Sequence, residues 1–172
     1  MRELLKNAIE NLAIYSVTMR DSIVKFGDGI NSLNINGISK KSQSFRRISK
    51  IEVIEMKVQG KDDSAKLFYS FHYEVGSRLV NPEDHESGDE AIPSMLCIEA
   101  TFEAIYQAKK ELEKNELEAF SAKNVGYNVW PYWREYLQST CSRVGVNPIK
   151  VPFYHMTGES DLRTELVSDD KS

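Results

Sequence analysis

The chain has 172 residues, of which 41% are hydrophobic and 28% charged, and its formal net charge is −4. These values are typical of a globular domain with its own core, and a net negative charge disfavours binding to nucleic-acid phosphates. No apolar run reaches the length of a membrane span, and the first residues lack a signal-peptide pattern. We therefore expect a cytoplasmic protein that binds no nucleic acid and does not insert into the membrane.

The first half of the chain predicts one helix followed by two strands. Apolar residues at helical spacing predict a short helix over residues 2–12. Alternating apolar and polar residues then predict a long strand over residues 14–26, which ends at a glycine-rich turn. Residues 30–47 are rich in Asn, Ser and Lys and predict a loop with room for a short extra strand. Residues 48–59 predict a second strand that is partly apolar on both faces, which suggests that one face meets a partner.

The second half predicts two more strands and two helices. Residues 66–76 and 93–106 alternate cleanly, and the acidic, polar segment 81–91 between them predicts a solvated connection. Short connections favour an antiparallel meander with one buried face. Residues 108–121 predict a weakly amphipathic helix. The fold class is therefore α+β: a four-stranded antiparallel sheet with helices packed on one face, plus the short N-terminal helix.

A second helix near the C-terminus is well delimited by its sequence. Asn128 is expected as its N-cap, Pro131 falls in its first turn, and Gly145 is expected as its C′ residue. One face carries apolar residues at the i, i+3, i+4 spacing: Trp133, Tyr136, Leu137, Thr140, Cys141 and Val144. Residues 1–156 are therefore assigned to one domain, and residues 157–172 to a polar tail expected to be mobile.

Residue patterns typical of catalysis or metal binding are largely missing from the sequence. The three histidines lie far apart, and the two cysteines show no metal-ligand spacing. His72 and Glu74 on one strand face are expected to form the solvated side of the sheet, and Cys97 is expected to be inert. The basic residues of segment 40–50 are expected to form a solvated loop. We therefore predict no catalytic residue, no metal site and no cofactor.

A set of aromatic and aliphatic residues near the C-terminus lies outside any helical period. A proline-interrupted apolar stretch cannot pack as a helix face, so it must line a groove, extend a sheet edge or contact another subunit. The residues are Trp130, Tyr132, Ile149, Val151, Phe153 and Tyr154. We therefore expect more apolar surface than the core of one domain needs.

Two motifs in this region resemble a known family. Asn-Val-Trp-Pro-Tyr-Trp-Arg-Glu (residues 128–135) and Pro-Ile-Lys-Val-Pro-Phe-Tyr (residues 148–154) look like the C-terminal signature of SecB-like protein-export chaperones. The resemblance implies an ATP-independent holdase with no cofactor, which binds unfolded polypeptides such as precursor proteins in apolar grooves. It also implies a homo-oligomer built as a dimer of dimers, and the SecA motor as a partner in protein transport and translocation.

Residue by residue, the resemblance assigns a client-binding groove and two candidate motor-docking residues. The groove would combine residues of the second strand with residues around the last helix: Ile51, Val53, Ile54, Met56, Trp130, Tyr132, Ile149, Val151, Phe153 and Tyr154. Asp21 and Glu99 would be the motor-docking acids. The chain departs from the export pattern at Lys25 and Ile98, where the export chaperones carry acidic residues.

Three alternatives stand beside the general export chaperone. The N-terminal helix and the acidic segment 81–91 are closer to the branch of the family that accompanies toxin–antitoxin pairs, in which the client is an antitoxin. A structural module would use the same apolar surface for assembly and bind no client. An enzyme would use His72, Glu74 or Cys97.

Overall fold

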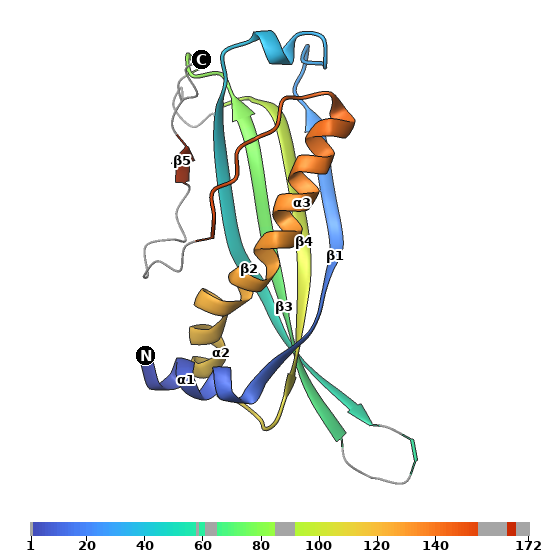
Figure 1. Ribbon diagram of the computed structural model, residues 1–172, viewed down its shortest axis with the longest axis vertical. Coiled ribbons are helices and arrows are strands. Elements are labelled where there is room, and N and C mark those ends of the chain that lie inside the picture. Colours follow the sequence, from blue (N-terminus) through green and yellow to red (C-terminus); the bar gives the residue numbers. More distant parts are fainter. Residues whose placement is uncertain (1, 58, 61–64, 85–91, 155–164, 168–172) are drawn as a thin grey trace.

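The computed structural model describes residues 2–57, 59–60, 65–84, 92–154 and 165–167. They form an α+β fold in which an antiparallel sheet is covered by helices on one face, as the sequence predicts (Figure 1). The elements in chain order are α1 (Arg2–Asn11), β1 (Leu12–Phe26), a 3-10 turn (Ile35–Gly37), β2 (Lys41–Lys57), β3 (Ala65–Val80), β4 (Ser94–Ala108), α2 (Lys114–Phe120), a π-helical turn (Ser121–Val125), α3 (Gly126–Val144) and β5 (Glu165–Val167).

The order of the strands differs from the predicted meander. It is β1-β4-β3-β2-β5, and every neighbouring pair is antiparallel. β2, β3 and β4 follow one another as a meander, but β1 pairs with β4, and the chain crosses the end of the sheet through residues 27–40 to reach β2 (Figure 1). This arrangement is a Greek key. The long connection between β1 and β2 permits it, but local sequence does not specify it.

β2 begins earlier than the sequence predicts. It starts at Lys41, so residues 41–47, predicted as part of a loop, belong to a strand of 17 residues. Each of these residues faces a partner on β3, from the pair Lys41 and Val80 to the pair Arg47 and Glu74. The low intrinsic strand preference of this polar segment is therefore outweighed by pairing with a long neighbouring strand.

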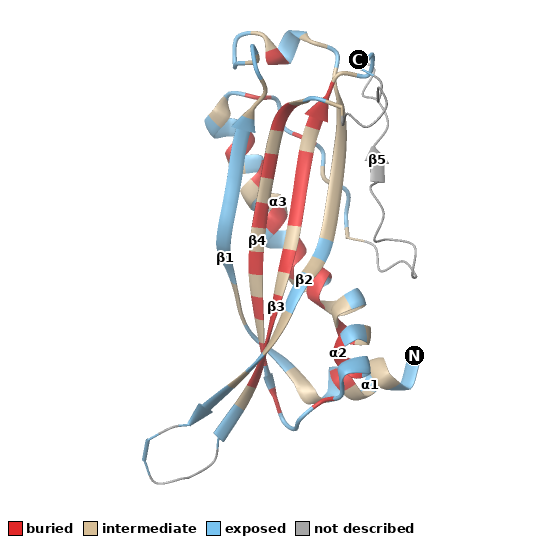
Figure 2. Cartoon of the chain, turned by 180° about the vertical axis from the view of Figure 1, so that it is seen from behind, coloured by how far each residue is buried: buried red, intermediate tan, exposed pale blue. Residues whose placement is uncertain are grey.

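The core lies between the sheet and α3. The central strands β3 and β4 alternate between buried and less buried residues (Figure 2). The helix-facing side chains are those that the sequence predicts: Tyr69, Phe71, Tyr73 and Val75 on β3, and Leu96, Ile98, Ala100, Phe102, Ala104 and Tyr106 on β4. α3 crosses this face and buries Val129, Trp133, Leu137 and Cys141 against it.

The start of α3 differs from the prediction. Asn128 is not an N-cap: it lies inside the helix, and its side-chain amide donates a 2.9 Å hydrogen bond to the Tyr106 hydroxyl. The helix is reached directly from the π-helical turn, so Pro131 also lies in its interior. The predicted end is confirmed, because Gly145 adopts a left-handed conformation with φ of 73° and its N–H closes the last turn.

Bulges shift the phase of β1 and β2. The β1 register shifts at Tyr15 and Arg20, and the β2 register shifts at Ser49. As a result Tyr15 contacts the Phe68 ring, at 5.3 Å between centroids, on the sheet face that carries no helix. Each bulge places two successive residues opposite one partner residue, and the alternation then resumes.

The remaining predictions concern the N-terminal helix, the acidic segment and the C-terminal tail. The predicted N-terminal helix is confirmed as α1. Residues 85–91 of the predicted acidic connection and most of the predicted tail 157–172 lie outside the described residues, although 165–167 pair with Ser42–Ser44 as β5. Among the helices that the structure describes, none is long and apolar enough to cross a membrane.

Candidate functional site

Three of the aromatic residues expected to line the groove, Trp130, Phe153 and Tyr154, meet arginines from β2 and α3. We call the group Tyr127, Trp130, Phe153 and Tyr154, with Arg46 and Arg134, the aromatic cluster. The Tyr154 ring lies 5.5 Å from the Trp130 ring and 6.4 Å from the Tyr127 ring. The Arg46 guanidinium lies 4.7 Å from the Tyr154 ring and 5.5 Å from the Trp130 ring, and Arg134 lies 4.9 Å from the Phe153 ring.

The segment after α3 forms the cluster because the chain reverses at Gly145 and returns along the helix. Asn36 fixes this reversal: its amide donates to the Gly145 carbonyl at 3.1 Å and its carbonyl oxygen accepts from the Asn147 N–H at 3.0 Å. Pro148 and Pro152 prevent a new helix, so the segment stays extended on its way to Tyr154. The Trp130 indole then donates a 2.9 Å hydrogen bond to the Pro152 carbonyl.

Exposure divides the predicted groove residues near the C-terminus into two groups. Trp130 and Ile149 are only 8% and 6% exposed, so the expectation that they lie outside the core is wrong. Phe153 is 74% exposed and Tyr132 is 49% exposed. Val151 and Tyr154 are partly buried against the core. Phe153 is therefore the strongest candidate for contact with another molecule.

The predicted residues of β2 do not form one surface. Ile51 and Val53 lie opposite Phe71 and Tyr69, on the helix-covered face of the sheet. Ile54 and Met56 lie opposite Phe68 and Lys66, on the face without helices. A single groove containing all four is therefore wrong, because neighbouring positions on a strand point to opposite faces. Ile51 and Val53 share their face with the aromatic cluster.

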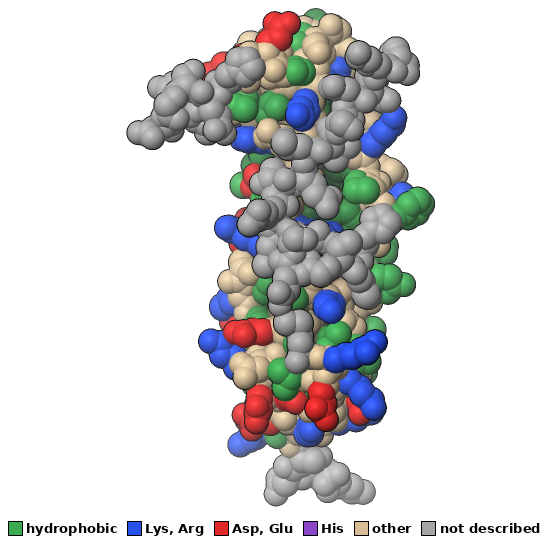
Figure 3. All heavy atoms as spheres, turned by 90° about the vertical axis from the view of Figure 1, so that its left-hand side faces the viewer, with side chains coloured by type: hydrophobic (Ala, Val, Ile, Leu, Met, Phe, Trp, Pro, Cys, Tyr) green, Lys and Arg blue, Asp and Glu red, His purple; other side chains and the backbone are tan. Residues whose placement is uncertain are grey.

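Two arginines lie against the aromatic rings of the cluster. The attraction between an arginine and the face of an aromatic ring contributes a free energy of about 0.5–2 kcal/mol, which is larger where water is excluded. Arg46 also lies near the hydroxyl of Tyr73, whose pKa is raised above its usual value, mainly by burial and then by the neighbouring Tyr154. Figure 3 views the molecule from the side of β2 and of the segment after α3, where hydrophobic side chains reach the surface between basic ones.

The two candidate motor-docking acids lie on the other face of the sheet. Asp21 lies opposite Thr101, and Glu99 lies opposite Ile23 on one side and Gly76 on the other. Both acids border one shallow hollow of about 210 Å³, together with Phe45. The structure thus brings Asp21 and Glu99 to one surface, and their docking role stays a prediction.

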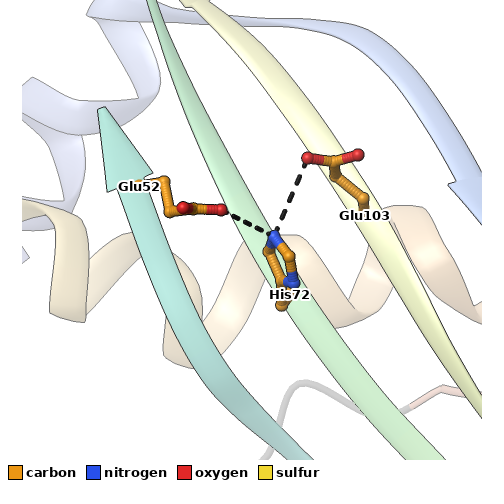
Figure 4. A group of neighbouring side chains, drawn as sticks. All are labelled: Glu52, His72 and Glu103. Carbon is orange, nitrogen blue, oxygen red and sulfur yellow. Dashed lines mark ion pairs between the residues drawn. The ribbon is translucent and has the colours of Figure 1, made fainter. Parts of the chain in front are cut away.

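A charged network occupies the middle of the same open face. His72 Nε2 lies 3.0 Å from Glu52 Oε2 and 3.7 Å from Glu103 Oε1 (Figure 4). The second oxygen of each carboxylate pairs with a cation: Lys50 lies 2.6 Å from Glu52, and Arg20 lies 2.9 Å from Glu103. The three ligand atoms are close enough to bind a metal ion, but both carboxylates already have a cationic partner. The arrangement is best described as a charge-balanced network.

The surroundings of the candidate catalytic residues do not favour a nucleophile. Burial, followed by the hydrogen bond to Glu99, raises the pKa of Cys97 to about 11, so its thiol is protonated near neutral pH. Glu74, which the sequence places beside His72, is held by Arg47 through a 2.6 Å contact. His72 and Glu74 lie on the helix-free face, as predicted for the solvated side of the sheet.

Several residues of these two sites were missed by sequence reasoning. Arg46 was assigned to a loop, and its place on the aromatic cluster follows only from the earlier start of β2. The link between Arg20 and Glu103 depends on the strand order and on a bulge. Local sequence carries no signal for either contact, since both join elements far apart in the chain.

Comparison with known proteins shows the SecB-like fold. One solved structure is similar to this chain with a TM-score of 0.58 and 12% sequence identity. The alignment covers 89% of this chain and 98% of the other chain. That structure is the Mycobacterium tuberculosis Rv1957 SecB-like chaperone in complex with a ChAD peptide from the Rv1956 HigA1 antitoxin. No protein-family model matches the sequence, and no curated protein matches it either.

Proposed function

We propose that this chain is an ATP-independent holdase that binds unfolded or non-native polypeptide at the aromatic cluster and the adjoining face of β2. The observation that carries the proposal is Phe153, a large aromatic residue that is 74% exposed at the end of an extended segment beside buried Trp130. Val53, on the same sheet face as the cluster, is 58% exposed. The complex of a similarly folded chaperone with a peptide supports client binding by this fold.

The physical basis of the proposal is burial of apolar surface without sequence-specific contacts. Unfolded chains expose apolar side chains, and their transfer from water to an aromatic surface is favourable by about 25 cal/mol per Å². Arg46 and Arg134 stack on the rings of the cluster, so cationic groups lie beside its apolar surface. Such a surface binds many clients weakly.

Replacing Phe153 tests the proposed surface. We expect Phe153→Ala to weaken binding of reduced, carboxymethylated α-lactalbumin, a permanently unfolded protein, by about tenfold, or about 1.4 kcal/mol. Because Phe153 is exposed, the melting temperature should stay unchanged. Fluorescence anisotropy of the labelled client measures the affinity. Leu33→Ala, at a side chain that is 94% exposed in a distant loop, is the matched control and should bind as the unmodified chain does. Absence of binding by the unmodified chain would contradict the proposal.

Within this function we propose two client classes that one experiment separates. A dedicated chaperone of an antitoxin would retain one small protein after affinity purification from its own cells, whereas a general export chaperone would retain many precursors and the SecA motor. The neighbour's antitoxin peptide supports the dedicated role. For the export role, Asp21 and Glu99 are the proposed motor-docking residues, and charge removal at both should abolish SecA retention without loss of client binding.

We also propose that the chain forms a homo-oligomer through the free edge of β1. This strand has 15 residues and, among the described parts of the chain, pairs only with β4. Its exposed side chains include large apolar residues: Ile14, Tyr15, Met19, Ile23 and Val24. An uncovered edge with such side chains readily pairs with a second copy, and a dimer of dimers is the larger assembly that we propose.

Lysine substitutions at β1 test the assembly. Met19→Lys combined with Ile23→Lys puts a charge on each face of the β1 edge, since Met19 lies opposite Phe102 and Ile23 opposite Glu99. The like charges of two copies would then repel each other, which should break the β1 interface and lower the mass measured by light scattering. Leu33→Lys adds a charge at an exposed apolar residue of a loop and should leave the mass unchanged. A double variant with unchanged mass would exclude the β1 edge as the interface. A stable oligomer that binds no unfolded client would favour the structural module.

A further inference from the structure

The segment that follows α3 lies on the molecule as a bound peptide would. Residues 146–154 form no helix or strand, yet Val151 and Tyr154 pack against the core. The contacts of the segment with α3 and β2 include the bond from the Trp130 indole to the Pro152 carbonyl and the stacking of the Tyr154 ring against Trp130 and Arg46. These are the contacts that an extended client would make, namely a backbone acceptor and a side chain in an aromatic recess.

A glycine on the helix creates the recess for Tyr154. A Cβ atom at Gly126 would collide with the Tyr154 hydroxyl oxygen and would lie 2.8 Å from two carbons of its ring. Such contacts are too short for any real side chain, so Tyr154 can occupy this place only while residue 126 lacks a Cβ. Gly126 has ordinary helical dihedral angles, φ of −59° and ψ of −40°, so its backbone conformation does not itself need glycine.

The chain also occupies the edge of β2 beyond this segment. Residues Glu165–Val167 pair with Ser42–Ser44, where an extended client could otherwise add a strand. Two separate parts of the chain after α3 therefore lie where the proposed client contacts would form: one over Trp130 and one along β2.

We propose that the Pro152 carbonyl and the Tyr154 ring are an internal competitor that a client must displace from Trp130 and Arg46, while the exposed Phe153 side chain stays available to the client. This inference rests on the proposed chaperone function and adds a regulatory step to it. Tyr154, which the resemblance places among the client contacts, is then the group that the client replaces. The affinity for clients is then lower than the intrinsic affinity by the fraction of molecules in which the segment has left.

The substitution Gly126→Ala tests this competition with a minimal change. Alanine favours the helix, so we expect the fold to be retained while the new methyl group forces the Tyr154 ring to move. Gly37→Ala is the matched control, because a Cβ atom there meets nothing within 4 Å. Tyr154→Ala removes the competitor directly, and the double variant Gly126→Ala with Tyr154→Ala shows whether the two changes act through the same step.

The first measurement needs no client. The chain has two tryptophans, so NMR shows two indole N–H signals, and the deeply buried Trp133 serves as the internal reference. In Gly126→Ala and Tyr154→Ala we expect faster solvent exchange of the Trp130 indole N–H, because its bond to Pro152 is lost. An unchanged exchange rate in both variants would overturn the proposal.

The second measurement uses carboxymethylated α-lactalbumin. We expect Gly126→Ala and Tyr154→Ala each to bind it about three- to tenfold more tightly than the unmodified chain, and the double variant to bind no more tightly than Tyr154→Ala alone. Exposure of Trp130 without a gain in affinity, or additive gains in the double variant, would overturn the competition and leave the chaperone proposal standing. Failure of every variant and of the unmodified chain to bind would overturn the chaperone proposal and the competition together.

Discussion

Trp133→Ala should lower the free energy of unfolding by about 3–5 kcal/mol, the range typical of a large aromatic residue removed from a core. Trp133 is 1% exposed, and its ring lies 6.2 Å from the Tyr136 ring at the centre of α3. The truncation leaves a cavity between the helix and the sheet that neighbouring side chains of β3 and β4 cannot fill without moving the backbone. Urea unfolding followed by circular dichroism measures the loss.

The neighbouring residue on the same helix provides the control for Trp133. Tyr132 is 49% exposed, so Tyr132→Ala should change the free energy of unfolding by less than about 1 kcal/mol. Because both substitutions remove an aromatic side chain from adjacent helical positions, helix propensity affects them about equally. Equal losses would show that α3 does not pack on the sheet as described.

Glu103→Ala should destabilise the fold by about 1–3 kcal/mol, because it leaves a buried hydroxyl without its acceptor. Ser70 is fully buried and donates a 2.6 Å hydrogen bond to Glu103, and Arg20 approaches the same carboxylate. Glu103→Gln retains an acceptor for Ser70 and should cost less. Glu55→Ala, at an exposed acidic residue of β2, is the control and should stay within about 0.5 kcal/mol of the unmodified chain.

The loss of stability in Glu103→Gln should depend on pH, because the pKa of Glu103 is shifted in the folded state. The hydroxyl of Ser70 and then the charge of Arg20 hold this pKa below its usual value. A lowered pKa in the folded state stabilises the fold above the unfolded value of about 4.3, and this stability is lost as the pH falls through the folded pKa. The difference in free energy of unfolding between the unmodified chain and Glu103→Gln should therefore be larger at pH 6 than at pH 3. If the difference in free energy of unfolding were larger at pH 3 than at pH 6, the hydrogen bonds and charges described around Glu103 would be contradicted.

The elements with a strong periodic pattern could be predicted from the sequence. α1, β3 and β4 were recognised because apolar residues recur at a period of 3.6 or 2, and most of the predicted face of α3, such as Trp133 and Leu137, is buried. Gly145 was correctly placed because a left-handed residue after a helix favours glycine. These features depend on interactions within one element, which local sequence determines.

Features that depend on contacts between distant elements could not be predicted in this way. Pairing of β1 with β4 satisfies the backbone as well as pairing with β2 would, and the apolar alternation within β1 does not distinguish the two. Asn128 has the composition of a cap, but its amide serves Tyr106 once the π-helical turn continues into α3. Trp130 was expected at the surface, and the chain's own Pro152 and Tyr154 cover it.

The candidate site was therefore found by composition more than by geometry. The cluster of aromatic residues near the C-terminus was evident because prolines exclude a helical role for Val151 and Phe153. The contact with Arg46 and the recess at Gly126 depend on how β2 and α3 pack in three dimensions, which the sequence does not specify. Exposure then separated Phe153, open to another molecule, from Trp130, closed by the chain itself.

The bulges in β1 bear on how homologous chains can differ in length. A residue inserted into or removed from a regular strand inverts every side chain beyond it, which would turn core residues to solvent. At Tyr15 and Arg20 the strand already accommodates one extra residue each, so a homologue that lacks either residue would keep Val17, Met19 and the rest of β1 in phase. Single-residue gaps in an alignment of this strand should accordingly fall at these two positions.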